Sequence, residues 1–140
     1  MCLKIDEKLT EKGLKGRKIH SNGMVKVWKV LDKFRLEGIL CSPHKSQFWQ
    51  PGWNVSDRPS KRLLNNEKKD KRVYKGIHVL MTKRCVKNFM DLNEIAVPVY
   101  VSKEDFVACG KSIYRGVFYD AVFTKVFLEE EDYNNALKGT

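Results

Sequence analysis

The chain has 140 residues, the usual size of one domain, and 42% of them are apolar, which is enough for a hydrophobic core. Its 27 Lys and Arg against 17 Asp and Glu give a formal net charge of +10, which favours an anionic partner. No apolar run approaches the roughly 20 residues of a membrane-spanning helix, and the N-terminal residues lack the apolar segment of a secretory signal. We therefore expect a single domain at 1–140, with no membrane contact and a cytoplasmic location.

The four cysteines predict neither disulfides nor a metal site. Cys2, Cys41, Cys85 and Cys109 lie at least 24 residues apart, so we expect reduced thiols. Cys85 and Cys109 have apolar neighbours and are typical of small core residues. Cys41 and His44 form a C-x-x-H half-site, but no second pair has zinc-like spacing. We expect no metal and no cofactor.

In chain order, the first dozen residues predict a short helix or a loose arm. Residues 17–20 and 24–31 predict the strands of a hairpin, because Asn22-Gly23 between them tolerates the positive φ angles of a tight turn. Residues 35–41 offer another short strand. From 42 to 75 no helical or strand periodicity is visible, and prolines and turn formers predict a long loop.

The second half of the chain predicts strands that are separated by short helices. Pro98 indicates an edge or bulged position for its strand, because proline lacks the N–H that a central strand uses. Ser102 to Asp105 resembles a capping box that starts a helix through Phe106–Ala108. The expected strands are 76–81, 94–101, 117–119 and 121–128, and the expected helices follow Thr82, follow Ser102 and close the chain at 129–138. These elements predict an α+β fold in which a mostly antiparallel or mixed sheet, either continuous or split, carries two or three short helices.

Two aromatic residues open the strongest candidate site. Trp49 and Trp53 lie in a segment without strand or helix period, where their faces could stack on a base while Asn54 reads its edge. The alternative is that both rings fold back as a lid over the core. The run 58–75 follows directly and carries eight basic and two acidic residues. The high density of positive charge in this run favours contact with phosphates, although any one of its lysines could simply be solvated.

Two further positions complete the candidate site. Lys83 and Arg84 follow Thr82 at a predicted helix start, where cations and open backbone N–H groups suit an anion, unless both side chains point into water. His78 interrupts an apolar strand, so it is either a hydrogen-bonded core residue or a ligand and general acid or base. The nominated ligand-binding residues are Trp49, Trp53, Asn54, Arg58, Lys61, Arg62, His78, Lys83 and Arg84.

Four short segments follow one another in an order that resembles small uncharacterised proteins of bacteriophages and large DNA viruses. They are Val27–Leu31, Gly76–Leu80, Asp105–Ala108 and Ala121–Phe127. The order of elements is also distantly similar to the ADP-ribosyltransferase fold, which holds NAD in a cleft of a split sheet. The first-strand Arg or His of that family falls near Lys29, its Ser-Thr-Ser-type element has no counterpart, and its terminal Glu could only be sought near Glu129 or Glu131. The resemblance implies a cleft for a nucleotide-like ligand and a role against host defence in the host cytoplasm.

The leading hypothesis is binding, in the form of sequestration, of an anionic nucleotide such as a cyclic oligonucleotide or an NAD-derived signal. One alternative is a module that binds single-stranded RNA or DNA with the same residues. Another is a nucleotide-processing enzyme, a phosphodiesterase or an ADP-ribosyltransferase-like protein, with His78 as general acid or base. We favour binding without catalysis, and the sequence leaves assembly into a homo-oligomer open.

Overall fold

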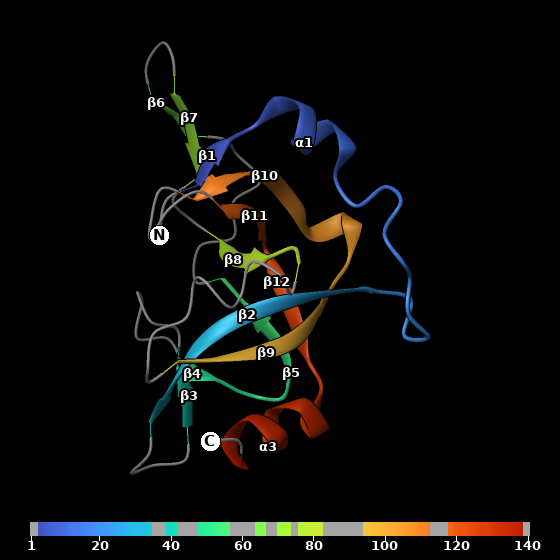
Figure 1. Ribbon diagram of the computed structural model, residues 1–140, viewed down its shortest axis with the longest axis vertical. Coiled ribbons are helices and arrows are strands. Elements are labelled where there is room, and N and C mark those ends of the chain that lie inside the picture. Colours follow the sequence, from blue (N-terminus) through green and yellow to red (C-terminus); the bar gives the residue numbers. More distant parts are fainter. Residues whose placement is uncertain are drawn as a thin grey trace.

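The strands of the protein pair into one continuous antiparallel sheet (Figure 1). The computed structural model describes residues 3–34, 39–41, 48–56, 64–66, 70–73, 76–82, 94–112 and 118–138. Within them the strands are β1 (Leu3–Ile5), β2 (Val25–Phe34), β3 (Ile39–Cys41), β4 (Phe48–Trp49), β5 (Gly52–Val55), β6 (Leu64–Asn66), β7 (Asp70–Val73), β8 (Ile77–Leu80), β9 (Glu94–Val101), β10 (Phe106–Ser112), β11 (Phe118–Phe123) and β12 (Lys125–Leu128). The helices are α1 (Glu7–Lys12), the short 3-10 turn η2 (Lys103–Asp105) and α3 (Glu130–Lys138).

Neighbouring strands run in the order β5-β12-β9-β2-β8-β11-β10-β1-β7-β6, with β3 beside β2 and β4 beside β3. The predicted α+β class is confirmed, and between the described strands the sheet is not split. Helix α1 lies at one end of the molecule and α3 at the opposite end (Figure 1). Among the described residues, no helix is both long enough and apolar enough to span a bilayer.

The longest strand pair, β2 with β9, forms the centre of the sheet. Their register runs from Val25 opposite Val101 to Asp32 opposite Glu94. The predicted strand at 94–101 is confirmed, but its predicted edge position is wrong, because β9 lies between β2 and β12. The pairing of β9 with β12 is at Tyr100, beyond Pro98, so a residue without an N–H is tolerated inside this central strand.

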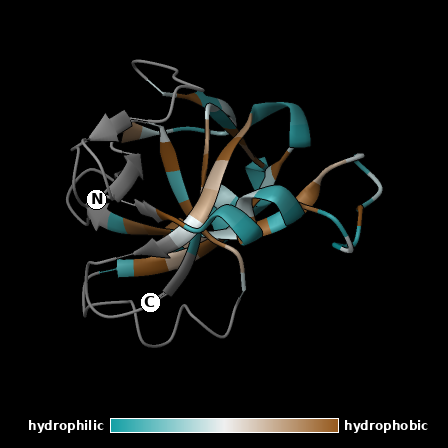
Figure 2. Cartoon of the chain, turned by 90° about the horizontal axis from the view of Figure 1, so that it is seen from above, coloured by the Kyte–Doolittle hydropathy of each residue, from teal (hydrophilic) through white to brown (hydrophobic). Residues whose placement is uncertain are grey.

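One face of the sheet forms a continuous hydrophobic core. It combines residues of strands from both halves of the sheet with Leu40 of β3, Trp49 of β4 and Ala136 of α3, and Leu9 of α1 packs against it. Hydrophobic residues follow the strands, whereas the helices are mostly hydrophilic (Figure 2). Half of the hydrophobic side chains with 0% exposure among the described residues are valines, including those at alternating positions 97, 99 and 101 of β9, where β-branched residues pack well on a pleated surface.

Helix α1 is fixed at both ends. Asp6 caps its start by accepting a hydrogen bond from Leu9 N at 3.0 Å. In the middle, the Thr10 hydroxyl donates to the carbonyl oxygen of Cys109 at 3.0 Å and accepts from Cys109 N at 3.1 Å, which ties the helix to β10. Gly13 closes the helix with φ +52°, a conformation that favours glycine. The predicted N-terminal helix is therefore present, after a first strand that was not predicted.

Only part of the predicted hairpin at 17–31 is present as regular structure. Ile19 pairs with Val25 as a single bridge, and only the second arm, β2, is a regular strand. The turn between them is closed by His20 N, which donates to Met24 O at 2.9 Å, and by Asn22, whose side chain accepts from Met24 N at 3.0 Å.

Two predictions of secondary structure are wrong. The segment 42–75, predicted as a loop, contains the short strands β4 to β7. Phe106–Ala108, predicted as a helix, belongs to β10, which pairs with β11 on one side and β1 on the other. The capping motif before it forms only the turn η2, because pairing with β11 outweighs a local helix signal. The helix predicted after Thr82 lies outside the described residues.

The predictions for the C-terminal third are confirmed. Strand β8 is buried along its whole length, and the two strands predicted within 117–128 are β11 and β12, although the break between them lies at 124 and not at the predicted 120. The break between these strands falls at Thr124, whose N–H donates to Asp105 O at 2.9 Å. Helix α3 starts with three acidic residues, which suits the positive end of the helix dipole.

Candidate functional site

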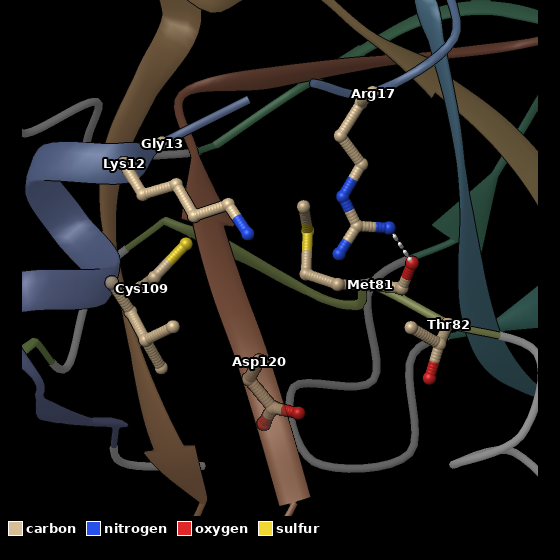
Figure 3. A pocket seen from close by; sticks show the side chains of 8 residues that line it. Lys12, Gly13, Arg17, Met81, Thr82, Cys109 and Asp120 are labelled. Carbon is tan, nitrogen blue, oxygen red and sulfur yellow. Dashed lines mark hydrogen bonds between the residues drawn. The ribbon is translucent and has the colours of Figure 1, made fainter. Parts of the chain in front are cut away.

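A pocket of about 180 Å³ opens between α1, the end of β8 and the middle of β10 and β11 (Figure 3). Its wall combines apolar, cationic and anionic side chains from segments that are far apart in the sequence. The lining residues are Leu9, Lys12, Gly13, Arg17, Met81, Thr82, Cys109 and Asp120.

Arg17 is held in place at the wall of this pocket. Its Nη1 donates to the carbonyl oxygen of Met81 at 2.6 Å, which links the segment after α1 to the end of β8. Two consecutive turns support the same segment, because Lys15 N donates to Lys12 O at 3.0 Å and Arg17 N to Leu14 O at 3.1 Å. The guanidinium has five N–H donors, so this one bond leaves others for a ligand.

Lys12 supplies the second cation. It is the last residue of α1, and the hydrogen bonds between Thr10 of α1 and Cys109 of β10 fix the position of the helix that carries it. In Figure 3 its ammonium group points across the pocket toward Arg17, with the Met81 side chain between the two. The pocket therefore presents two positive side chains that approach it from opposite sides.

Asp120 adds one buried carboxylate. It is 1% exposed and stands on β11 opposite Gly110 of β10 and Leu80 of β8. Because two cations and one anion line the pocket, it suits a ligand that carries both a negative group and a hydrogen-bond donor. A phosphate would be attracted to Lys12 and Arg17, whereas a hydroxyl or amino group would suit Asp120.

Cys109 lines the same pocket as a protonated thiol. Burial raises its pKa from the ordinary 9.0 to about 11, even though the nearby Arg17 guanidinium lowers the pKa. The carboxylates of Asp120 and Asp6 raise the pKa as well. A thiol with such a pKa is not a nucleophile near neutral pH. The prediction that Cys109 is a small core residue is confirmed.

Two of the nominated aromatic-loop residues are buried rather than open to a ligand. Trp49 is 2% exposed and belongs to the core cluster, so its ring packs as the alternative interpretation describes. The Asn54 side chain bridges the connection between β4 and β5. Its Oδ1 accepts from Gln50 N at 3.1 Å, and its Nδ2 donates to Gln50 O at 2.8 Å and to Gly52 O at 3.3 Å. The roles of base stacking for Trp49 and edge recognition for Asn54 are therefore not supported.

Trp53 differs from both, because 41% of its surface is exposed. It stands on β5 and contacts the edge of Phe127 with ring centroids 5.2 Å apart. The ammonium of Lys125 lies 4.5 Å from its ring centroid. Of the three nominated loop residues, Trp53 is the one that keeps an accessible aromatic surface.

His78 is buried at 6% exposure in β8 and does not line the pocket. Its carbonyl oxygen accepts a hydrogen bond of 2.8 Å from the ammonium of Lys29, a lysine that is itself buried in β2. The structure thus fits the interpretation of His78 as a core histidine. Lys29, where the family resemblance places an Arg or His, contributes to the packing between β2 and β8.

The other nominated residues lie outside the part of the chain that the structure describes: Arg58, Lys61, Arg62, Lys83 and Arg84. Thr82, which precedes Lys83 in the sequence, lines the pocket. The predicted anion site therefore begins, in the sequence, directly after a residue that lines the pocket.

Lys12, Arg17 and Asp120 are not among the site residues predicted from the sequence. A signal for the first two was present, since residues 12–18 carry four cations around Gly13 and Gly16. The segment does not match a phosphate-binding Walker loop, because no Lys-Ser or Lys-Thr follows Gly16. No sequence signal connects Asp120 to this segment, because the strand register alone brings them together.

Comparison with protein families, with curated protein sequences and with solved structures finds no match to this chain. Over the described ranges, no group of three or more His, Cys, Asp or Glu side chains could hold a metal ion.

Proposed function

We propose that the protein binds an anionic nucleotide in the pocket between α1, the end of β8 and the middle of β10 and β11. The observation that carries this proposal is the convergence of Lys12 and Arg17 from opposite sides of one pocket (Figure 3). The formal net charge of +10 supports it, because a positive field raises the local concentration of anions.

The mixed lining favours a nucleotide over inorganic phosphate. Phosphate oxygens would bind Lys12 and Arg17, and a sugar hydroxyl or a base amino group would donate to Asp120. A carboxylate that accepts from a ribose hydroxyl is a common way for proteins to recognise the sugar of a nucleotide.

The volume limits how much of the ligand is enclosed. Pockets that enclose a whole small molecule have about 300–1,000 Å³, and this one has about 180 Å³. We infer that one phosphate and part of its sugar enter the pocket, while the rest of the ligand lies at the mouth. Cyclic oligonucleotides and NAD-derived signals both offer such a phosphate and sugar.

The proposed role is sequestration without turnover, which lowers the free concentration of a signalling nucleotide. This role agrees with the resemblance to small phage and large-DNA-virus proteins, where holding a defence signal of the host would benefit the virus.

The test is isothermal titration calorimetry with ADP-ribose, NAD, a cyclic dinucleotide, a cyclic trinucleotide and orthophosphate. Lys12→Gln removes one charge from the pocket and should weaken nucleotide binding by about 10- to 100-fold, the value of a charge-assisted hydrogen bond. Lys15→Gln is the matched control, because Lys15 is exposed on the same segment and does not line the pocket. It should leave the affinity almost unchanged.

Two results would contradict the proposal. One is that none of the nucleotides binds more tightly than orthophosphate. The other is an equal loss of affinity in Lys12→Gln and Lys15→Gln, which would indicate attraction by the whole basic surface instead of recognition in the pocket.

A further inference from the structure

A row of aromatic and lysine side chains crosses the sheet at the end away from the pocket. Trp53 of β5 stands opposite Phe127 of β12, Phe127 opposite Tyr100 of β9, and Tyr100 opposite Lys26 of β2. Directly opposed residues of antiparallel strands lie on the same face of a sheet. With about 4.8 Å between strands, this aromatic row is about 14 Å long.

Ring contacts extend the row into a larger surface. Trp53 and Phe127 meet edge to face at 5.2 Å between centroids, and His20 contacts Tyr100 in the same way at 5.6 Å. A second tryptophan, Trp28, lies two positions after Lys26 on β2, with the Lys26 ammonium 5.1 Å from its ring centroid. The face thus presents four aromatic rings together with a histidine.

The cations of this face lie directly on the aromatic rings. Lys125 covers Trp53 at 4.5 Å and Lys26 covers Trp28 at 5.1 Å. At exposed sites such a cation–π contact is weak, so either lysine can exchange its ring for a phosphate oxygen. That exchange would uncover a ring face for a base and place the ammonium beside the adjoining phosphate.

Acidic groups mark one border of the row. Burial raises the pKa of the Tyr100 hydroxyl, and the carboxylates of Asp132 and Glu129 next to it raise the pKa further. Asp132 lies in the first turn of α3, and Glu129 directly precedes this helix. Burial raises the pKa of Asp132, and because Lys26 opposes that rise, this lysine also lies near the border. A phosphate chain would therefore be repelled on the α3 side and attracted on the side of Lys125.

We propose that the aromatic row is a stacking platform for single-stranded RNA or DNA, a second binding surface that is independent of the pocket. Open sheets that bind single strands stack about two or three bases on exposed aromatic rings. The row offers the rings of Trp53, Phe127 and Tyr100 on neighbouring strands.

The position of the row separates it from the pocket. The row occupies β5, β12, β9 and β2, whereas the pocket is built from α1, the segment after it and the β8, β11 and β10 side of the sheet. The two surfaces share no residue, so each can be altered by substitution while the other is intact.

The experiment measures the fluorescence anisotropy of labelled 12-nucleotide oligo(U) and oligo(dT) with the full chain at several salt concentrations. Trp53→Leu keeps an apolar side chain against Phe127 but removes the stacking ring, and it should weaken binding by about 5- to 150-fold. Trp53→Phe is the matched variant that keeps an aromatic ring and should retain most of the affinity. Lys125→Gln should reduce the slope of log affinity against log salt by about one.

Two more variants sharpen the result. Asp132→Asn removes a border charge and should tighten binding, whereas Lys12→Gln in the pocket should leave oligonucleotide binding unchanged. The proposal is overturned if neither oligonucleotide binds at low salt, or if Trp53→Leu and Trp53→Phe bind equally well. Because Lys12→Gln weakens nucleotide binding and Trp53→Leu weakens oligonucleotide binding, failure of one proposal is distinguishable from failure of the other.

Discussion

Replacing Gly76 by alanine would put a methyl group where the start of β8 leaves no room. A Cβ at this position would lie 2.5 Å from Cγ1 of Val122 and 3.2 Å from the backbone oxygen of Phe123. Val122 is fully buried, so its side chain has no open space to turn into. The φ angle of Gly76 is +106°, a conformation that residues with a Cβ rarely adopt.

The two effects add to a large loss of stability. Backbone strain of this kind costs about 1–3 kcal/mol, and overpacking of a core costs about 1–3 kcal/mol more. We expect Gly76→Ala to lower the free energy of unfolding by about 4 kcal/mol. For a chain of 140 residues, in which each kcal/mol shifts the midpoint by about 3–4 °C, the melting temperature should fall by about 12–16 °C.

Urea unfolding followed by circular dichroism, together with scanning calorimetry, would measure this loss. Gly23→Ala is the control, because Gly23 has a φ of +77° but nothing within 4 Å of the added Cβ. It should therefore show the backbone strain alone. If Gly76→Ala destabilised the protein no more than Gly23→Ala does, the tight approach of Gly76 to Val122 would be refuted.

Two further predictions concern buried polar groups. Because the pKa of Cys109 in the folded chain is about 11 and the ordinary value is 9.0, its alkylation by iodoacetamide at pH 8 should be about a hundredfold slower than in the unfolded chain, as read by mass spectrometry of its peptide. The unfolded chain loses this proton first, so the stability difference between the protein and Cys109→Ala should shrink by about 2–3 kcal/mol from pH 9 to pH 11, and a constant difference would contradict the raised pKa. Asn54→Ala removes three hydrogen bonds around Gln50 and Gly52 and should cost about 2–3 kcal/mol in urea unfolding. Asn54→Asp keeps the acceptor for Gln50 N but places a buried carboxylate oxygen against the carbonyl oxygens of Gln50 and Gly52, so it should cost at least as much as Asn54→Ala. A smaller cost would show that the bond accepted from Gln50 N carries the effect.

Local patterns in the sequence were enough for the elements whose own residues are strongly biased. The apolar run at 76–81 predicts β8, and the acidic start of 129–138 predicts α3, which begins at Glu130. In both, the burial or the capping preference is a property of consecutive residues, so it can be read without knowledge of the partner strands.

Pairing between distant strands decided the cases in which local patterns failed. Phe106–Ala108 follows a capping motif but forms part of β10, because this segment pairs with Val122 and Phe123 of β11. Trp49 and Trp53 lie four residues apart in a segment without periodicity. One is buried and the other exposed, because β4 pairs with β3 while β5 pairs with β12.

By itself the sequence determined the α+β class and the basic charge, because these depend on composition and on short-range patterns. It did not determine the site. Lys12 and Arg17 meet Met81, Cys109 and Asp120 only after α1 has packed on β10 and the strands have found their register. The chemistry of a pocket depends on which side chains share a space, and for segments about a hundred residues apart only the tertiary structure decides that.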